Sequence, residues 1–372
     1  MAQIKEPYGL VYNTDGSLCA TYRDDDIPFA GVRSFAVEEA TTNLVNVYTL
    51  HANSGQYTVS TIERIDTPFG MKDVVKIMKT GTGSLFRFKR LYSPVSGEAV
   101  AITLFVKPIN GLSQIIIAQN FGLTKSYTFA TGDSHIKNDW HKITHKFIAN
   151  QNNVEIFLDT YGPSVEGNQG CYVISQVESG KRYCTSYVDG SRSKGQLTIH
   201  LNLDVNNAVT NFWFKIGSIF ELDSNGTRII AFSGDIPTQN RFFIRADGYT
   251  NNATLKFYDS IDDAGPNLRS TMKNIDLVKW NMFTIVFDNG LIKIYLNENL
   301  LTQYTVSLNP IALKYLNIPE ITPEFLKTGF WSNLYFGKYR KPDGTVIWTD
   351  DYIREVYEAK IPFPVQSQLS IY

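Results

Sequence analysis

The stretch "DWHKITHKFIANQNNVEIFL" (139–158) decides the fold, because its pattern returns in "KWNMFTIVFDNGLIKIYL" (279–296). In both copies a Trp opens a run typical of a strand, a Phe follows seven residues later, and a turn leads to a second run. The turn of the first copy is two residues longer. We expect Trp140 and Trp280, and Trp213 between them in the chain, to be core aromatic residues between packed sheets. A pattern that occurs twice predicts two modules of one strand order.

The flanking sequence repeats in the same way. "AVAITLFVKP" (99–108) resembles "AVTNFWFKIG" (208–217), and "QIIIAQ" (114–119) parallels "RIIAFS" (228–233). These runs are rich in Val, Ile, Thr and aromatic residues, and Gly, Asn or Asp turns separate them at intervals of about 8 to 14 residues, which is typical of a sandwich or barrel. Helical periodicity is clear only in "DDYIREVYEA" (350–359), which Thr349 would cap. The sequence predicts an all-β protein of two tandem jelly-roll β-sandwiches with a short C-terminal helix.

Three segments follow from this pattern. We expect an N-terminal extension over 1–36, a first jelly roll over 37–192 and a second over 193–372. "QVESGKRYCTSYVDGSR" (176–192) would be the joint between the modules, because its glycines suit a chain crossing. The extension is too short for a core of its own. It would dock on another copy or on a neighbouring protein; a flexible tail with one short hairpin is the alternative.

Bulk properties exclude several classes of protein. A formal net charge of -1 over 372 residues argues against a nucleic-acid binder, which needs a basic excess. No run approaches the roughly 18 apolar residues of a membrane helix, so we expect no membrane insertion. The N-terminus has no apolar signal region. Cys19, Cys171 and Cys184 are sparse, which fits folding in a reducing cytoplasm.

The residues that could carry chemistry do not form an active site. Laminarinase-type glycosidases place three carboxylates on one strand face, and the nearest match is "ELDSNG" (221–226), where Gly226 takes the place of the last acid. His141 and His145 would share a strand face, but four strand residues span roughly 13 Å, too far for one zinc ion without a bend. We therefore expect a protein that is not an enzyme and requires no cofactor.

Two loops offer oxygen ligands of the kind that calcium prefers. "DSNG" (223–226) contributes Asp223 and Asn225. "YDSIDDAGPN" (258–267) contributes Asp259, Asp262 and Asp263. The same residue types also simply make turns, so both interpretations stay open.

A glycan site needs an exposed aromatic face, which covers the apolar face of a sugar, beside amide or carboxylate groups that bind its hydroxyls. Tyr249 with Asn251 and Asn252, in "DGYTNNA" (247–253), meets this requirement in a loop. Trp331 with Asn333, in "GFWSNLYFG" (329–337), is the second candidate. The latter stretch equally fits a buried strand.

Several motifs resemble a known group of proteins. "AVEEATTNLV" (36–45), the joint at 176–192 and "NFWFKIG" (211–217) are similar to the tail and virion structural proteins of bacteriophages and prophages. The first module resembles jelly-roll carbohydrate-binding modules. The second, with "LYFGKY" (334–339), resembles the concanavalin A-like and laminin-G-like sandwich. The resemblance leaves residues 1–36 unexplained.

The resemblance implies a non-enzymatic virion component on the tail or the capsid, assembled in the host cytoplasm. Its partners would be other virion structural proteins and further copies of itself, as a homo-oligomer such as a trimer. It would adhere to host-surface polysaccharide through loops at one end of a sandwich. The alternatives are a bacterial surface lectin, against which the missing signal region argues, and a glycan hydrolase, which lacks the carboxylate spacing. The position in the particle and the identity of the glycan stay open.

Overall fold

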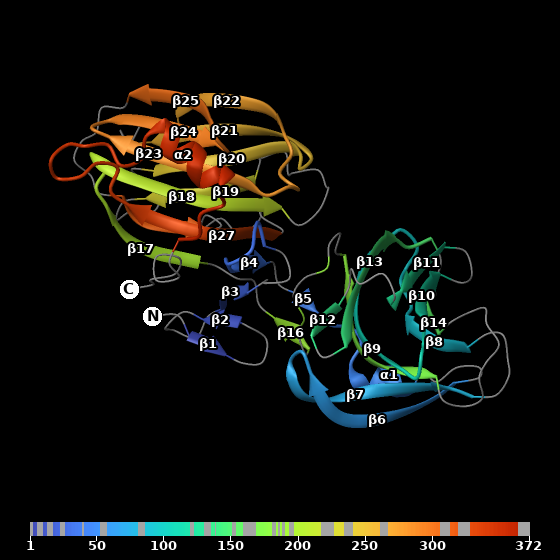
Figure 1. Cartoon of the computed structure of the whole chain (residues 1–372). Helices are drawn as coiled ribbons and strands as arrows, with labels where there is room; N and C mark the ends of the chain where they lie inside the picture. Colours follow the sequence, from blue (N-terminus) through green and yellow to red (C-terminus); the bar gives the residue numbers. More distant parts are fainter. Residues whose placement is uncertain are drawn as a thin grey trace. The chain divides into compact units, whose positions relative to one another are not determined.

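A computed structural model of the chain describes residues 3–5, 10–12, 18–22, 27–38, 41–52, 58–80, 86–119, 123–129, 135–137, 139–150, 154–158, 169–180, 184, 187, 190–192, 197–216, 227–233, 241–260, 267–305, 313–318 and 328–363. The chain forms two compact units (Figure 1). Unit 1 comprises residues 1–5, 9–39 and 193–372, and unit 2 comprises 6–8 and 40–192. Each is built from antiparallel sheets, so the all-β prediction is confirmed. Among the described helices, none is long and apolar enough to cross a membrane.

In the part of unit 2 that the structure describes there are two main sheets and one short helix. The six-stranded sheet runs in the order β12 (His135–Lys137), β13 (Trp140–Ile148), β9 (Ala99–Ile109), β15 (Gly170–Ser179), β7 (Gly70–Lys79) and β6 (Thr58–Thr67). The four-stranded sheet runs β11 (Leu123–Thr128), β10 (Gln114–Gln119), β14 (Val154–Leu158) and β8 (Phe86–Tyr92). β5 (Thr41–Thr42) pairs with β16 (Ser191–Arg192), and α1 (Val47–Ala52) follows β5. Aliphatic residues from both main sheets form one core, which includes Val75, Ile102 and Ile156.

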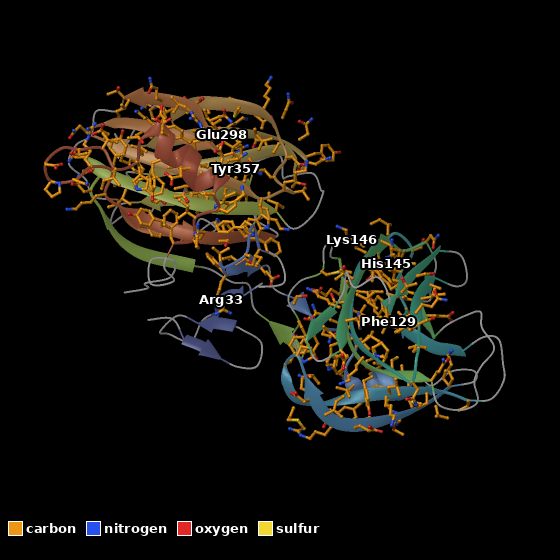
Figure 2. All side chains as sticks on the ribbon, viewed as in Figure 1. Arg33, Phe129, His145, Lys146, Glu298 and Tyr357 are labelled. Carbon is orange, nitrogen blue, oxygen red and sulfur yellow. The ribbon has the colours of Figure 1, made fainter. Side chains whose placement is uncertain are left out.

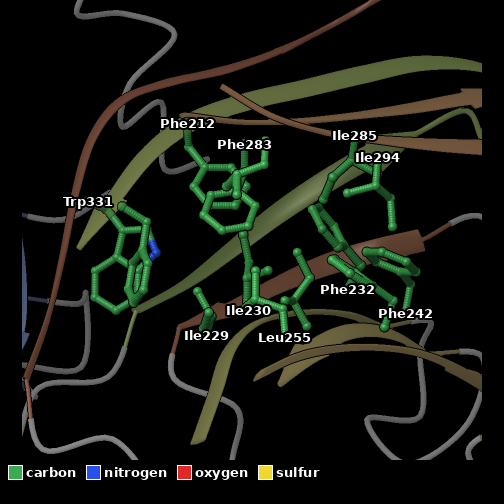
Figure 3. Packing of buried hydrophobic residues seen from close by; sticks show 14 of the residues in the cluster. Phe212, Ile229, Ile230, Phe232, Phe242, Leu255, Phe283, Ile285, Ile294 and Trp331 are labelled. Atoms are coloured by element: carbon green, nitrogen blue, oxygen red, sulfur yellow. The ribbon is translucent and has the colours of Figure 1, made fainter. Parts of the chain in front are cut away.

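The described residues of unit 1 also form two sheets. The nine-stranded sheet runs β1 (Gln3–Lys5), β2 (Leu10–Tyr12), β3 (Leu18–Tyr22), β4 (Ser34–Glu38), β27 (Thr328–Gly337), β18 (Asn207–Ile216), β23 (Asn281–Asp288), β24 (Leu291–Leu296) and β25 (Asn299–Thr305). The six-stranded sheet runs β17 (Leu197–Leu203), β26 (Leu313–Ile318), β19 (Thr227–Ser233), β20 (Arg241–Tyr249), β21 (Asn252–Ser260) and β22 (Asn267–Ile275). Figure 3 shows the core between them, where Phe212 stacks on Phe283 with ring centroids 5.3 Å apart.

The helix α2 (Asp350–Glu358) covers the other face of the nine-stranded sheet, where its buried Ile353 and Val356 join the cluster that contains Trp213. Thr349 caps the helix as predicted, since its Oγ1 accepts a hydrogen bond from the backbone N–H of Tyr352 at 3.1 Å. The ring of Tyr357, labelled on α2 in Figure 2, stacks on Trp213. This helix is the short C-terminal helix that the sequence predicts.

Relative to the alignment of 99–108 with 208–217, the two repeated hairpins differ by one residue in strand register. His141 lies opposite Val106, and Asn281 lies opposite Phe214. In both copies the predicted Phe, seven residues after its Trp, still lies opposite an apolar residue of the central strand: Phe147 opposite Val100, and Phe287 opposite Ala208.

Trp140 is fully buried, but it packs with Phe105 on the face of its sheet that points away from the core between the sheets. Trp213 is buried, and Trp280 partly buried, in the cluster beneath α2. The prediction that these three residues lie between packed sheets is therefore wrong.

The repeat ends at the next strand, and here the prediction of one strand order is wrong. β24 pairs with β23 in the same sheet, whereas β14 pairs with β10 and β8 in the opposite sheet. The turn explains the difference. Asn289 and Gly290 have φ angles of 50° and 85°, as in the type I′ turn of a tight hairpin. The first copy has two more residues at this point, which gives the chain the length to cross to the other sheet.

The N-terminal segment differs from the predicted separate extension. β4 pairs with β27, which places Phe35 opposite Trp331, and β3 pairs with β4. The described part of residues 1–36 therefore adds strands to the sheet of unit 1. Unit 2 interrupts unit 1 between β4 and β17, so the chain contains an inserted sandwich rather than two sandwiches in tandem.

The ends of unit 2 are joined by its own hydrogen bonds. Thr41 lies opposite Arg192 and Thr42 opposite Ser191 in the β5–β16 pair. Thr41 Oγ1 also donates a hydrogen bond to the buried carboxylate of Glu178. Within the stretch 176–192, β15 ends at Ser179, Gly180 follows with a φ of 69°, and Ser191–Arg192 forms the strand that pairs with β5.

Candidate functional site

A pocket of about 500 Å³ opens in unit 2 where β7 and β15 diverge. The two strands pair only from Gly170 opposite Met78 to Val173 opposite Val75. Beyond Val173, β15 takes a different neighbour, since the backbone N–H of Leu44 donates to the carbonyl of Val177 at 2.9 Å. The pocket is lined by Asn43, Val45, Asn46, Val47, Tyr48, Leu50, Arg64, Phe69, Met71, Lys72, Asp73, Val173, Ile174, Ser175, Tyr187 and Gly190.

The side chain of Asn43 hydrogen-bonds to the edge of β15 beyond Val173. Its Nδ2 donates to the carbonyl of Ser175 at 2.9 Å, and its Oδ1 accepts from the backbone N–H of Val177 at 3.0 Å. One amide thus makes the two bonds that a paired strand residue makes with its backbone. The backbone groups of Ser175 and Val177 are therefore hydrogen-bonded without β7, and the pocket lies between the two strands.

Aromatic rings form one wall of the pocket. Tyr187, from the stretch 176–192, stacks on Phe69 with ring centroids 4.5 Å apart, and both rings meet the edge or face of Phe105. The ammonium of Lys72 lies 5.1 Å from the centroid of Tyr187. Because these rings interlock, the wall is rigid before any ligand arrives.

The short helix α1 presents an exposed ring at the pocket. Asn46 caps the helix, since its Oδ1 accepts from the backbone N–H groups of Tyr48 and Thr49 at 3.0 and 2.9 Å. Leu50 anchors it in the core, and His51 Nδ1 shares a hydrogen bond of 3.0 Å with Ser60 Oγ on β6. On this fixed helix Tyr48 is 65% exposed.

The strands β6 and β7 contribute charge and a second exposed apolar group. Arg64 lies opposite Asp73, and its Nη1 lies 3.3 Å from Asp73 Oδ1. Their side chains are 65% and 42% exposed, so the pair adds little to stability and remains open to a ligand. Met71, two residues before Asp73, is 56% exposed. The pocket thus combines exposed apolar surface with hydrogen-bond donors and acceptors.

A second polar cluster on β6, β7 and β15 already has its partners. Lys76 Nζ donates to Glu63 Oε1 at 3.0 Å, and Tyr172 Oη donates to Glu63 Oε2 at 2.9 Å. The hydrogen bond from Lys76 lowers the pKa of Glu63, and the same bond raises the pKa of Lys76. Both oxygens of Glu63 are used, so this cluster fits a role in holding the strands together.

One of the two aromatic sites predicted from the sequence lies on the surface of the protein. Tyr249 and Asn252 lie opposite each other at the ends of β20 and β21, and Asn251 is in the turn between them. Tyr249 is 53% exposed, and both asparagines are exposed. The hairpin of unit 1 thus presents a ring beside two amides.

Trp331 and Asn333 are placed elsewhere. Trp331 is 0% exposed and packs against Phe35 and Phe214 in the core. Asn333 is 1% exposed; its Nδ2 donates to the carbonyl of Ile361 at 2.9 Å, and its Oδ1 accepts from the backbone N–H of Phe363 at 2.7 Å. Neither side chain offers a surface that a sugar could reach, and the buried-strand interpretation of this stretch is the one that holds.

The predicted calcium ligands lie mostly outside the described residues. This applies to Asp223, Asn225, Asp262 and Asp263, whereas Asp259 lies in β21 with its side chain outside the description. In the part of the chain that the structure describes, no group of three or more His, Cys, Asp or Glu side chains gathers as a metal site would require. Calcium therefore stays a prediction.

Sequence reasoning missed Tyr48, Arg64 and Asp73. The combination of an exposed ring and a nearby amide, applied to Tyr249, also describes Tyr48 and Asn46 in "NVY" (46–48). Arg64 and Asp73 are nine residues apart, and only the β6–β7 register brings them together.

Comparison with known proteins gives weak structural similarities. No family model matches the chain, and no curated protein matches it either. A carbohydrate-binding module, CBM66, from Bacillus subtilis is 18% identical over 41% of this chain and 89% of its own, with a TM-score of 0.29. Domains LG4-5 of the mouse laminin alpha1 chain are 11% identical over 72% and 90%, with a TM-score of 0.28. A SAP-like pentraxin from Limulus polyphemus is 15% identical over 44% and 75%, with a TM-score of 0.31.

Proposed function

We propose that this chain is a non-enzymatic glycan-binding protein and that the pocket of unit 2 is its main binding site. The observation that supports this most strongly is the pocket itself. The exposed Tyr48 and Met71 and the exposed Arg64–Asp73 pair line one cavity of about 500 Å³, on rigid strands and a capped helix.

The chemistry of these groups suits a sugar. The Tyr48 ring provides an apolar face for the C–H groups of a pyranose, as aromatic platforms do. Arg64 donates hydrogen bonds and Asp73 accepts them, so together they match the hydroxyl groups of a sugar, which do both. The volume falls within the roughly 300 to 1,000 Å³ of small-molecule sites, enough for a short stretch of a polysaccharide.

The carboxyl groups at the pocket favour binding of a glycan without cleavage of a glycosidic bond. Glycosidases use a pair of carboxyl groups about 5 to 9.5 Å apart across the scissile bond. Among the described residues that line the pocket, Asp73 is the one acid, and it is paired with Arg64. A hydrolase would need a second acid at this site.

The hairpin of Tyr249, Asn251 and Asn252 is proposed as a second, weaker contact in unit 1. It is an exposed turn rather than a cavity, so it can cover only one face of a sugar. Two weak sites on one chain, multiplied by the copies in an oligomer, gain affinity by avidity on a polymeric glycan.

Display on a phage virion, on the tail or the capsid, is proposed as the setting of this binding. It is supported by the sequence resemblance of 36–45, 176–192 and 211–217 to virion structural proteins. The alternative setting is a bacterial surface lectin. Immunogold electron microscopy of phage particles and of bacterial cells would separate the two, since label on particles is the result that the virion proposal expects.

The binding proposal is tested by titrating the full chain with a panel of bacterial polysaccharides. We expect Tyr48→Ala to weaken binding by about tenfold or more, because a lost aromatic platform costs on the order of 1.5 kcal/mol. Tyr249→Ala is the matched variant: an exposed tyrosine of unit 1 whose loss should have a smaller effect. Equal binding by the wild type and Tyr48→Ala would contradict the assignment to the pocket. Release of reducing sugar that Glu221→Gln abolishes would instead show an enzyme.

A further inference from the structure

We infer that the glycan bound in the unit 2 pocket is anionic and carries carboxylate or sulfate groups. This rests on the proposed function and adds the class of ligand. Among the described lining residues, Arg64 and Lys72 are cationic and Asp73 is acidic, so the pocket carries a formal charge of +1 (two cations minus one acid), whereas the whole chain is at -1.

Arg64 supplies the geometry that an anion needs. Its Nη1 makes a single contact of 3.3 Å with one oxygen of Asp73, which uses one of the five guanidinium N–H groups. Guanidinium groups bind carboxylate and sulfate best through two parallel N–H donors. Because the Arg64 side chain is 65% exposed, its remaining N–H groups can turn toward a ligand without breaking a buried contact.

Lys72 adds a second positive charge to the same cavity. Its ammonium lies 5.1 Å from the centroid of the Tyr187 ring, which holds the charge near the aromatic wall. A neutral sugar would gain little from these two cations. A glycan with a negative charge on each repeat unit would gain from both, and more so at low ionic strength.

The experiment compares charged polysaccharides with their neutral counterparts. The full chain is titrated calorimetrically with a panel of uronate-bearing and sulfated polysaccharides, each beside its carboxyl-reduced or desulfated form. For at least one pair we expect the anionic form to bind about tenfold or more tightly, since a charged hydrogen bond contributes on the order of 1.5 kcal/mol. The difference should shrink as salt rises.

Variants assign the effect to the pocket. Arg64→Gln should remove most of the preference for the anionic polysaccharide. Arg64→Lys should keep part of this preference, because the positive charge remains but the paired N–H donors of the guanidinium group are lost. Arg354→Gln is the matched control: Arg354 makes the same kind of exposed contact, Nη1 to Asp351 Oδ1 at 3.2 Å, in unit 1. Its loss should leave both affinities unchanged.

The outcomes separate this inference from the proposed function. Equal affinity for charged and neutral forms, weakened by Tyr48→Ala, would overturn the anionic preference and leave glycan binding in place. A charge preference that survives Arg64→Gln but is lost in Arg354→Gln would also overturn it. Absence of binding across the panel would overturn both.

Discussion

The ring of Tyr187 stacks on the ring of Phe69 with centroids 4.5 Å apart and an angle of 24° between the planes. The two residues are 118 positions apart in the chain, since 187 minus 69 is 118. This contact fixes the end of the 176–192 stretch against the β6–β7 hairpin and makes the aromatic wall of the pocket. The stretch that we expected to be a joint therefore also lines the pocket that we propose as the binding site.

Tyr187→Ala is predicted to destabilise unit 2 and to weaken the pocket. Tyr187 is buried and also meets Phe105, so the loss of the ring should cost about 3 kcal/mol. Tyr187→Phe keeps the stacked ring and should cost less than about 1.5 kcal/mol. Urea unfolding of the full chain measures both values. Equal stability of the two variants would show that the ring contact does not hold this segment.

Asn43→Ala is predicted to destabilise unit 2 by about 1 to 3 kcal/mol, because it leaves the backbone groups of Ser175 and Val177 without the amide that they bond. Thr42→Ala is the control, since its side chain makes an exposed bond to Ser191 Oγ and should change stability by less than about 0.5 kcal/mol. Urea denaturation compares the two. A cost for Asn43→Ala no larger than that of the control would contradict the role of this amide.

Residues 40–192 are predicted to fold as an independent protein. They contain a hydrophobic core of their own, and β5 and β16 join their ends. The excised segment should show cooperative unfolding and a dispersed NMR spectrum. The complementary chain, with 40–192 replaced by a short Gly-Ser linker, should keep the fold of unit 1. Noncooperative unfolding of the excised segment would contradict the division into an inserted and a host unit.

Trp331→Ala is predicted to lower the stability of unit 1 without changing the affinity for glycan. Because Trp331 is fully buried against Phe35 and Phe214, the change should destabilise unit 1 by about 3 to 5 kcal/mol. Glycan affinity of the surviving folded protein should stay within about twofold of the wild type, since the ring does not reach the surface. A variant of normal stability that has lost glycan binding would restore Trp331 as a sugar-stacking residue.

The stability of unit 2 is predicted to fall in alkaline solution through Tyr127. Burial, and then the nearby Cys184, raise the pKa of Tyr127 to about 12 from 10.0. Its Oη donates a hydrogen bond to the carbonyl of Thr144, so the folded state retains the proton. Between about pH 10 and pH 12 the unfolded chain loses this proton first, and the stability that the raised pKa contributes below pH 10 is lost. Tyr127→Phe should flatten this part of the pH profile of urea unfolding. An unchanged profile would contradict the assignment to Tyr127.

The sequence predicted the strands better than their order in the sheets. The alternation of apolar residues and the Trp-led hairpins located β9, β13, β18 and β23 and their pairing, because these strands are buried and regular, but not the one-residue difference in register between the aligned copies. The pattern could not show that β14 changes sheet, which depends on turn length. It also could not show that β4 pairs with β27, because these strands are almost 300 residues apart in the chain.

The site was harder to predict than the fold, for a physical reason. The pocket exists because β7 and β15 diverge after Val173 and Asn43 satisfies the backbone left behind. Residue type alone does not reveal such a divergence. Tyr249 could be found because an aromatic residue in an Asn-rich turn is exposed in most contexts, whereas Trp331 lies in a strand among other aromatic and apolar residues and is buried.

The most direct test of the central claim is hydrogen–deuterium exchange of the full chain, with and without the polysaccharide of the panel that binds most tightly. If the unit 2 pocket binds the glycan, protection should appear in α1 and in the β7 segment 70–73, and Tyr48→Ala should abolish it. Protection confined to the Tyr249 hairpin, or none in unit 2 at saturating glycan, would contradict the claim.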